Sequence, residues 1–319
     1  MGEFELIEKY FKVPSRRKDV DLGPGDDCAL LSVPPDMQLA VSTDTLVSGV
    51  HFMPDSDPVD LGYKALAVNL SDLAAMGAEP RWVSLALTLP SINEAWVAGF
   101  ASGFLELADY YNVALVGGDM TRGPLSITVS VKGTVPRGKA LLRSGAKAGD
   151  AIYVTGTLGD AALALTHLLG RRTLNDNQLA AVLPRLEHPH PRILAGQALR
   201  GIATAAMDLS DGLASDLGHM LRASGVRARI HLDRLPMSPV LKDAVSQEEA
   251  WQLALAGGDD YELLFTVPEA YRGTLDTALA HCGVKFGRVG RISAGEPGID
   301  WLLHEKPQPL QLKGWDHFA

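Results

Sequence analysis

Aspartates recur at the ends of the expected strands and helices, often beside a glycine. They are Asp26, Asp27, Asp44, Asp72, Asp119, Asp208, Asp211, Asp259 and Asp260. Any one of them is an ordinary turn residue, but most follow a glycine or a β-run, and most lack an adjacent Lys or Arg. Carboxylates gathered without a cation would repel one another and raise their own pKa values.

The donor set indicates which cation would join these carboxylates. The chain has no Cys-x-x-Cys pair and no His-x-x-x-His spacing, so a zinc site is not expected. Hard oxygen ligands suit Mg²⁺, which is usually shared with substrate phosphates. The pattern therefore predicts a metal-dependent phosphoryl-transfer or ATP-using site, which needs in-line positioning and charge neutralisation more than covalent help.

Asp72 lies on a predicted helix that we expect to be the central element of the first half of the chain. Residues 58–76 are apolar nearly all round, which predicts a buried helix that Gly77 ends and Pro80 cannot extend. Asn69 lies three residues before Asp72 and shares its face. A carboxylate there is costly unless a cation or hydrogen-bond donors satisfy it. Asn69 either orients Asp72 or satisfies the packing of the helix.

Two predicted strands deliver further oxygen ligands. Residues 39–47 read as a strand whose apolar start turns polar at Ser42, Thr43 and Asp44. Residues 113–119 read as a buried strand that ends in a glycine turn at Gly117-Gly118 and then Asp119. His51 lies in the loop after the first of these strands, residues 39–47. A lone histidine in a loop is more often a surface or structural residue than a ligand.

The N-terminal segment is expected to hold a short amphipathic helix over residues 3–11. The Gly23–Ala29 stretch carries Asp26 and Asp27 and reads equally well as an ordinary turn before a strand at residues 28–31. Cys28 is interpreted as a buried residue of that strand.

A segment rich in turn residues, 137–150, separates two expected domains, residues 1–137 and 138–319. Arg143 in this segment is a candidate bidentate phosphate clamp, and the alternative is a surface residue of a linker. Residues 151–169 have the strand, glycine turn and helix order of a phosphate loop, but lack the Lys-Ser/Thr ending of a Walker motif. Residues 208–212 open a helix after a strand, and residues 256–261 form a glycine turn before another strand.

Composition narrows the class of protein. The chain has 319 residues, 46% of them hydrophobic, and a net charge of −9 from 29 basic and 38 acidic residues, which argues against a nucleic-acid binder with a general basic face. We expect no leader peptide, since the first residues show no amphipathic Arg-rich or signal-peptide pattern, and no apolar run reaches membrane length, so we expect no membrane partner. Cys28 and Cys282 lie far apart, which fits a protein of the reducing cytoplasm.

Seven blocks together resemble the thiamine-monophosphate kinase family, of the superfamily that includes aminoimidazole ribonucleotide synthetase and selenophosphate synthetase. They span nearly the whole chain in the family's order: Gly23-Pro-Gly-Asp-Asp27, Ser42-Thr-Asp-Thr45 with Gly49-Val-His-Phe52, Asn69-Leu-Ser-Asp-Leu-Ala-Ala-Met-Gly77, Gly117-Gly-Asp119, Asp208-Leu-Ser-Asp-Gly-Leu213, Gly257-Gly-Asp-Asp-Tyr-Glu-Leu263 and Gly314-Trp-Asp-His-Phe318.

The resemblance implies a mixed α+β fold of two domains, like that of aminoimidazole ribonucleotide synthetase. It implies an N-terminal sheet domain that binds ATP and Mg²⁺ and pairs in a homodimer, and a C-terminal α/β domain that completes the substrate site. The implied activity is ATP-dependent phosphorylation of thiamine monophosphate to thiamine diphosphate, the last step of thiamine diphosphate biosynthesis, by direct transfer without a phosphoenzyme.

The resemblance also implies roles for single residues. The Mg²⁺ ligands would be Asp27, Ser42, Thr43, Asp44, Asp72, Asp119 and Asp208, with Asp211 as an outer ligand. The nucleotide contacts would be Gly118, Asp119, Arg143 and Ser210, and the substrate contacts His51, Asp259 and Trp315, whose ring offers an aromatic face to thiamine. The family usually has Glu where this chain has Asp259, which is one methylene shorter.

Two alternatives are weighed against this interpretation. Another ATP-using member of the superfamily would need a different signature, but Cys28 lies on the wrong side of the Asp pair for a selenophosphate synthetase, and the chain lacks the C-terminal Cys of the hydrogenase-maturation member. A non-catalytic nucleotide-binding protein would bind ATP without turnover, which the carboxylates in every block argue against.

Overall fold

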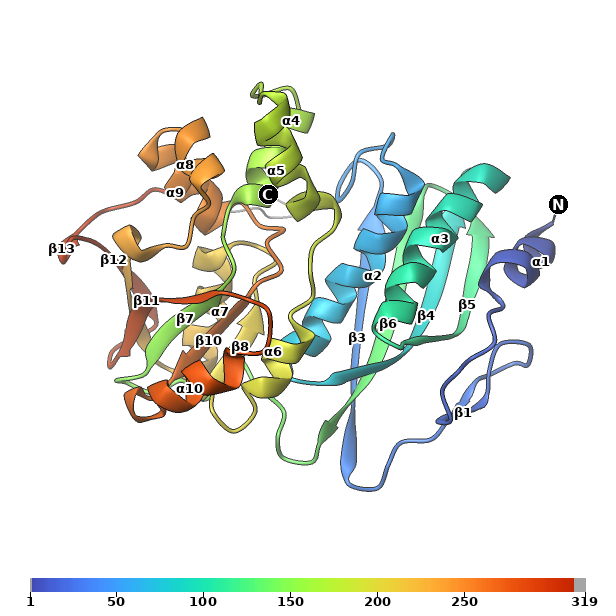
Figure 1. The fold of residues 1–319 in the computed structure, drawn as a ribbon, viewed down its shortest axis with the longest axis horizontal. Coiled ribbons are helices and arrows are strands. Elements are labelled where there is room, and N and C mark those ends of the chain that lie inside the picture. The colour runs from blue at the N-terminus through green and yellow to red at the C-terminus, as the bar shows by residue number, and fades with distance from the viewer. Residues whose placement is uncertain (1, 313–319) are drawn as a thin grey trace. The chain divides into compact units, whose positions relative to one another are not determined.

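The structure is a computed structural model that describes residues 2–312 (Figure 1). The chain forms two compact units. The N-terminal unit holds the residues up to Leu73 together with Ala78–Gly138, and the C-terminal unit holds Ala74–Gly77 together with the residues from Lys139 onward. Each unit has its own sheet with helices packed on it, so the class is mixed α+β, as the resemblance implies.

The sheet of the N-terminal unit has four strands in the order β3-β6-β4-β5. Their bounds are β3 Met37–Val47, β4 Glu79–Leu89, β5 Ala114–Arg122 and β6 Ser126–Pro136. β6 is antiparallel to β3 and β4, whereas β4 and β5 are parallel and need the crossover that a helix between them supplies. The predicted glycine turn is wrong, because β5 continues through Gly117, Gly118 and Asp119 to Arg122.

Two helices cover one face of this sheet, α2 Pro58–Ala75 and α3 Glu94–Tyr110 (Figure 1). They approach closely at two glycines: a Cβ on Gly103 would lie 1.9 Å from the Val59 carbonyl oxygen, and one on Gly62 would lie 2.1 Å from that of Phe100. The backbones of the two helices therefore touch. This contact fixes the distance of α2 from α3 and the rotation of α2 about its own axis.

The end of α2 confirms the predicted stop. Gly77 has φ of +64°, which favours glycine. Its N–H donates to the Ala74 carbonyl, and the Ala78 N–H donates to the Leu73 carbonyl at 2.8 Å. This pair of bonds satisfies carbonyls that the end of the helix would otherwise leave free.

The N-terminal segment is less regular than predicted. A single helix over residues 3–11 is replaced by α1 Glu3–Leu6 and a π-helical turn η1 Ile7–Phe11. Strands β1 Val20–Leu22 and β2 Leu30–Leu31 form a small antiparallel pair. The strand expected at residues 28–31 is shortened to β2, and Cys28 is exposed in a bend rather than buried, because the glycine and aspartate run before it continues the turn.

The sheet of the C-terminal unit has seven strands in the order β13-β12-β9-β11-β7-β10-β8. Their bounds are β7 Ala151–Thr155, β8 Ala205–Asp208, β9 Arg227–His231, β10 Leu263–Val267, β11 Phe286–Ser293, β12 Gly298–Leu303 and β13 Lys306–Pro307. Its helices are α4 Asp160–Leu168, α5 Asp176–Glu187, α6 Ile193–Ala198, α7 Leu213–Ser224, α8 Pro239–Ala244, α9 Gln247–Ala256 and α10 Arg272–Leu279, with 3₁₀ turns η2 Leu232–Arg234 and η3 Glu269–Tyr271.

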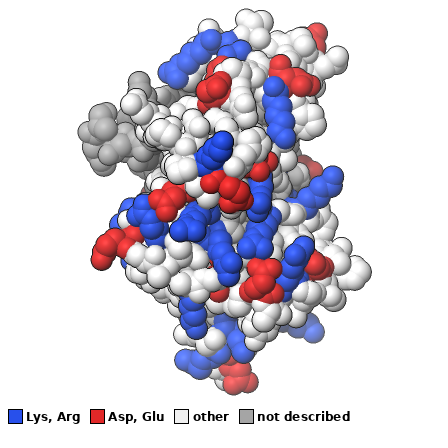
Figure 2. All heavy atoms as spheres, turned by 90° about the vertical axis from the view of Figure 1, so that its left-hand side faces the viewer, with Lys and Arg blue, Asp and Glu red and all other residues white. Residues whose placement is uncertain are grey.

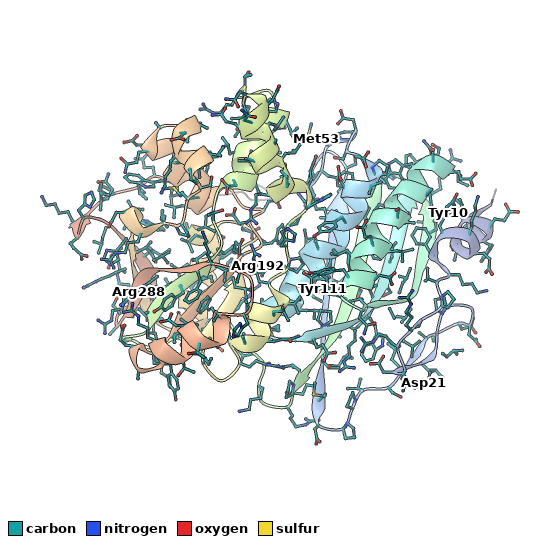
Figure 3. The ribbon with its side chains drawn as sticks, viewed as in Figure 1. Tyr10, Asp21, Met53, Tyr111, Arg192 and Arg288 are labelled. Atoms are coloured by element: carbon teal, nitrogen blue, oxygen red, sulfur yellow. The ribbon has the colours of Figure 1, made fainter. Side chains whose placement is uncertain are left out.

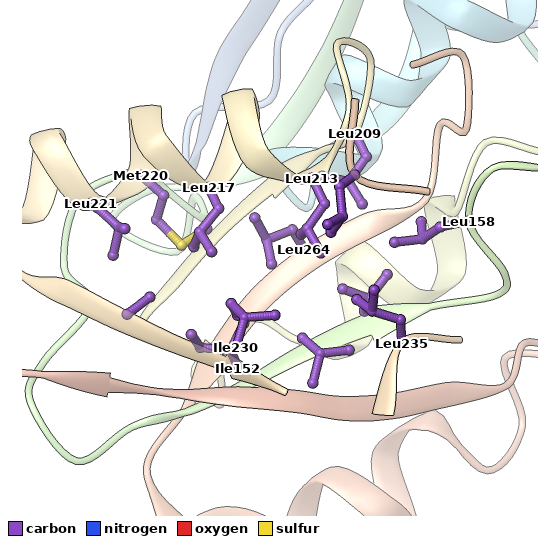
Figure 4. Close-up of a cluster of buried hydrophobic side chains, with 14 of the residues drawn as sticks. Ile152, Leu158, Leu209, Leu213, Leu217, Met220, Leu221, Ile230, Leu235 and Leu264 are labelled. Carbon is purple, nitrogen blue, oxygen red and sulfur yellow. The ribbon is translucent and has the colours of Figure 1, made fainter. Parts of the chain in front are cut away.

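The core of this unit lies between its sheet and α7. Leu213, Leu217 and Met220 on one face of α7 meet Ile152 of β7 and Leu264 of β10 (Figure 4). Alternate residues of these strands and every third or fourth residue of the helix supply the contacts, which is the spacing that each element requires. The packed strands and helix give the loops at their ends a firm base.

Two surface properties bear on function. No helix within residues 2–312 is long and apolar enough to span a membrane. On the face drawn in Figure 2, Lys and Arg side chains are interspersed with Asp and Glu.

Candidate active site

The N-terminal unit brings together residues of β3 and α2. The Ser42 hydroxyl donates to Asp72 Oδ2 at 2.5 Å. The backbone N–H of Asp44 donates to Asn69 Oδ1 at 3.1 Å, and Asn69 Nδ2 donates to the Ala65 carbonyl at 2.9 Å. A hydroxyl, two carboxylates and an amide therefore meet where β3 passes α2, and three of these residues, Ser42, Asp44 and Asp72, are predicted Mg²⁺ ligands.

Local structure explains this meeting. Ser42 and Asp44 are two residues apart on a strand and so point to the same face, which is the face that α2 covers. Asn69 and Asp72 are three apart on α2 and share one side of the helix. Asn69 is fully buried and ties the backbone of β3 to α2, so its contact is with Asp44.

The electrostatics of this pair fit a cation. Asp44 retains exposed surface, yet the packing around its carboxylate, and then the charge of Asp72, raise the pKa of Asp44 to about 6. Two carboxylates and a hydroxyl are hard oxygen donors of the kind that Mg²⁺ prefers. A divalent cation would remove the repulsion that disfavours the charged form.

The opposite face of the sheet carries two of the predicted ligands. Thr43 lies between Ser42 and Asp44 and therefore points away from α2. Asp119 lies in a cross-strand row with Ala86, Thr128 and Thr45, which places it on the same side as Thr43. Among residues 2–312, no group of three or more His, Cys, Asp or Glu side chains is arranged to hold a metal ion, and the predicted Mg²⁺ ligand set remains a prediction.

Three more predicted residues belong to the N-terminal unit. Asp27 is exposed in a bend and its N–H donates to Asp26 Oδ1 at 2.8 Å. His51 folds back on its own strand, because its Nδ1 accepts from the Val47 N–H at 3.0 Å. Gly118 has φ of +159°, and a Cβ there would lie 1.8 Å from the Leu85 carbonyl oxygen, so only glycine fits.

In the C-terminal unit, two loops lie against each other. One begins at Asp208, the last residue of β8, and holds Ser210 and Asp211, and the other precedes β10 and holds Asp259. The Asp259 N–H donates to the Ser210 carbonyl at 2.8 Å, and the Tyr261 hydroxyl donates to Asp259 Oδ1 at 3.1 Å. Four residues predicted as metal, nucleotide or substrate contacts are therefore brought to one place.

The other predicted residues of this unit have different surroundings. Arg143 is exposed, and within residues 2–312 its guanidinium makes no hydrogen bond or ion pair, whereas its carbonyl accepts from the Ser224 hydroxyl at 3.3 Å. Trp315 lies outside the described residues.

Sequence reasoning missed a buried cluster next to these loops. Glu262 is fully buried against Arg185 and Arg192, which lie about 70 residues earlier in the chain. Arg192 is labelled in Figure 3. Glu262 belongs to one of the seven blocks that carry the resemblance. A glutamate directly before a buried strand needs a cationic partner, and this need was the signal that could have pointed to Arg185 and Arg192.

This fold, a sheet-and-helix unit of about half the chain followed by a second one, defines a class. Residues 25–135 match the family AIR synthase related protein, N-terminal domain, and residues 147–301 match AIR synthase related protein, C-terminal domain.

Full-length relatives narrow the class. The thiamine-monophosphate kinase of Escherichia coli strain K12 is 56% identical over 320 residues, covering 100% of this chain and 98% of the relative. The crystal structure of thiamine-monophosphate kinase from Stenotrophomonas maltophilia K279a superposes with a TM-score of 0.85 at 45% identity, covering 92% of this chain and 93% of that one. AaThiL complexed with AMPPCP and TMP gives a TM-score of 0.77 at 32% identity, covering 99% and 96%. The chain belongs to the thiamine-monophosphate kinase family, which confirms the resemblance.

Proposed function

We propose that this protein transfers a phosphoryl group from ATP to thiamine monophosphate and so forms thiamine diphosphate. Membership of the thiamine-monophosphate kinase family, at 56% identity over the whole chain, supports the reaction. The relative complexed with AMPPCP and TMP supports the pair of substrates. The observation in the molecule that carries the proposal is the meeting of Ser42, Asp44 and Asp72 where β3 passes α2.

The chain would act by position and charge. Asp44 and Asp72, with Asp27, Asp119, Asp208 and the outer Asp211, would hold Mg²⁺, and Ser42 and Thr43 would add oxygens. Bound Mg²⁺ would neutralise phosphate charge. Asn69 fixes the end of β3 against α2, and the hydroxyl of Ser42 orients the Asp72 carboxylate. These residues would hold their positions before the substrates arrive, which is where such sites gain rate.

The remaining contacts divide between the two substrates. Arg143 would take nucleotide phosphates with its two-pronged guanidinium, together with the backbone around Gly118 and Ser210. Asp259, His51 and Trp315 would lie on the thiamine side. Transfer would be direct, and a single displacement inverts the configuration at phosphorus, so chirally labelled ATP distinguishes it from transfer through a phosphoenzyme.

A homodimer would use the sheet face that α2 and α3 leave uncovered. Val41 and Leu39 of β3 point to this face and are 58% and 49% exposed. Exposed aliphatic residues in a row on a sheet mark an interaction surface. Thr43 and Asp119 share the face, so pairing would also enclose two of the proposed ligands.

The test is incubation of the purified protein with Mg-ATP and thiamine monophosphate, with thiamine diphosphate measured. Asp72→Asn keeps an acceptor for the Ser42 hydroxyl but removes the charge, so the fold should persist while turnover drops by about a hundredfold or more. Asp109→Asn, an exposed residue of α3, is the matched control and should leave turnover unchanged. Near-normal turnover of Asp72→Asn at saturating Mg²⁺ would remove Asp72 from the metal site.

A further inference from the structure

Glu262 is a carboxylate of the C-terminal unit with four hydrogen-bond donors. It is fully buried, and each of its oxygens accepts from two donors. Oε1 accepts from Nη2 of Arg185 at 2.6 Å and from Nη2 of Arg192, and Oε2 accepts from the Thr155 hydroxyl at 2.6 Å and from Nε of Arg192 at 2.7 Å. Burial alone would raise the pKa of Glu262, but the two arginines hold it below its ordinary value.

Such a network is an expensive way to stabilise a fold. Desolvation of buried ion pairs offsets most of their attraction. Well-packed apolar residues in the same place commonly stabilise a fold equally well. Glu262 also crowds its neighbours, since a Cβ on Gly156, in the turn after β7, would lie 2.0 Å from Oε1. The arrangement therefore points to a requirement for a defined geometry at this place.

The backbone of the loop that leads to Glu262 is strained. Asp259 and Tyr261 have φ of +60° and +49°, conformations that cost non-glycine residues about 1–3 kcal/mol each and persist only where the surroundings enforce them. The neighbouring Asp260 is also pinned, because its Oδ1 accepts from the Gly159 N–H at 2.9 Å. The side chains of Asp260 and Glu262, two residues apart, therefore both hold the loop in place.

The same loop fixes the one after β8. The Leu209 N–H donates to the Glu262 carbonyl at 2.9 Å, and the Tyr261 N–H donates to the Leu209 carbonyl at 2.8 Å. The side chain of Glu262 is held by the arginines while its backbone holds Leu209, the residue after Asp208. A shift of Glu262 would therefore move both loops.

We propose that Glu262, clamped by Arg185 and Arg192, is a positioning residue that sets Asp259 against the Asp208–Asp211 loop. The inference rests on the proposed function, because that function gives these two loops their substrate and nucleotide contacts. Arg185 lies on α5 and Arg192 just before α6, so the clamp couples the segment between these helices to the site. Weakening the clamp should loosen the loops before it unfolds the unit.

The test compares Arg192→Lys with Arg172→Lys. Arg192→Lys keeps the charge but cannot reproduce the two parallel bonds to Glu262. Arg172 also pairs with a carboxylate of the same unit, but only through Nη2, which donates to both oxygens of the partly exposed Glu249 at 2.6 and 2.7 Å. Arg172→Lys therefore controls for the loss of an Arg–Glu pair outside the clamp. Glu262→Gln is the second variant of the clamp, and Arg192→Lys carries the test if Glu262→Gln does not fold.

Two readouts separate positioning from a structural role. Arg192→Lys weakens a buried pair and should lower the melting temperature more than Arg172→Lys, whose pair is partly exposed, so stability does not separate the two roles. Measured well below both melting temperatures, kcat/KM for thiamine monophosphate should fall about tenfold in Arg192→Lys and stay unchanged in Arg172→Lys. Hydrogen exchange of the Leu209, Asp259 and Tyr261 amides should accelerate in Arg192→Lys and not in Arg172→Lys, while exchange in β7 and β10 stays unchanged.

Other results overturn the inference. If the two variants match in activity and in exchange, the clamp is structural only. A loss of activity without faster loop exchange also overturns it, because the loops would not have loosened. Failure of the wild-type protein to form thiamine diphosphate would refute the proposed function instead, and the exchange comparison would still decide the positioning role.

Discussion

Replacing Asn69 tests how the first half of the site is built. Asn69 is fully buried, and its Oδ1 accepts from the Asp44 N–H at 3.1 Å. Asn69→Leu keeps the branched shape and the number of side-chain heavy atoms, although Leu is larger, and it removes this acceptor. A buried N–H left without a partner costs about 1–3 kcal/mol, and the cost for the part-buried Asp44 N–H lies toward the lower end of that range. The Ala65 carbonyl loses only an extra donor, because the helix still supplies its own bond, and the added apolar surface offsets part of the cost. We expect a net loss of about 1–2 kcal/mol in the free energy of unfolding.

The assay is urea unfolding of wild-type protein and variant, followed by thiamine diphosphate formation at saturating substrates and Mg²⁺. Asn93→Ala is the control: Asn93 caps α3 and accepts from the Trp96 N–H at an exposed site. Its loss should cost about 1 kcal/mol and leave kcat intact. Asn69→Leu should reduce kcat as well, because the end of β3 that carries Asp44 is no longer tied to α2. Wild-type stability together with wild-type kcat in Asn69→Leu would refute this reasoning.

Three further predictions concern the fold and the assembly. Asp19 accepts from Arg17, Arg81 and the Trp82 indole; burial opposes its ionisation, but the arginines lower its pKa to about 2. Its contribution of about 2 kcal/mol should therefore be complete above pH 4 and disappear between pH 4 and 2, so urea unfolding of wild type and Asp19→Asn should differ at pH 5 and converge at pH 2. Gly103→Ala forces a Cβ against the Val59 carbonyl and should cost about 1–3 kcal/mol or more, whereas Gly273→Ala, with open space around it on α10, should gain about 0.5–1 kcal/mol; equal melting temperatures would contradict the helix contact. Val41→Lys should shift the protein toward monomer in analytical ultracentrifugation, and an unchanged sedimentation coefficient would show that Val41 lies outside any dimer interface.

Local signals in the sequence were sufficient for the elements that carry the site. The apolar run before Gly77 predicted α2 to within one residue of its end, because glycine in a left-handed conformation and a following proline leave no other reading. The apolar start and polar end of residues 39–47 predicted a strand, which the structure has as β3 Met37–Val47. In that strand the two-residue spacing of Ser42 and Asp44 places both on one face. The position of Asp72 opposite them follows from the resemblance, and the structure brings Ser42 to Asp72.

Other features depend on pairing that a single sequence does not encode. Gly117-Gly118 looks like a turn, but close approach to β4 at Leu85 allows β5 to continue through it. The face on which Asp119 falls depends on a register shift between β4 and β5, and one residue of shift exchanges the two faces. Glu262 finds Arg185 and Arg192 only through the tertiary fold, so its role could not be predicted from spacing.

The packing of α2 gives the charge of Asp72 its significance. A carboxylate that could swing or withdraw would relieve the repulsion from Asp44. Here the contact of Gly62 and Gly103 with the neighbouring backbone fixes the helix, and the Ser42 hydroxyl fixes the carboxylate. The repulsion is therefore retained, and it adds to burial, the larger cause, in raising the pKa of Asp44. A rigid pair of carboxylates that cannot relax would gain most from a divalent cation, so an apolar, closely packed helix is a suitable support for the proposed Mg²⁺ site.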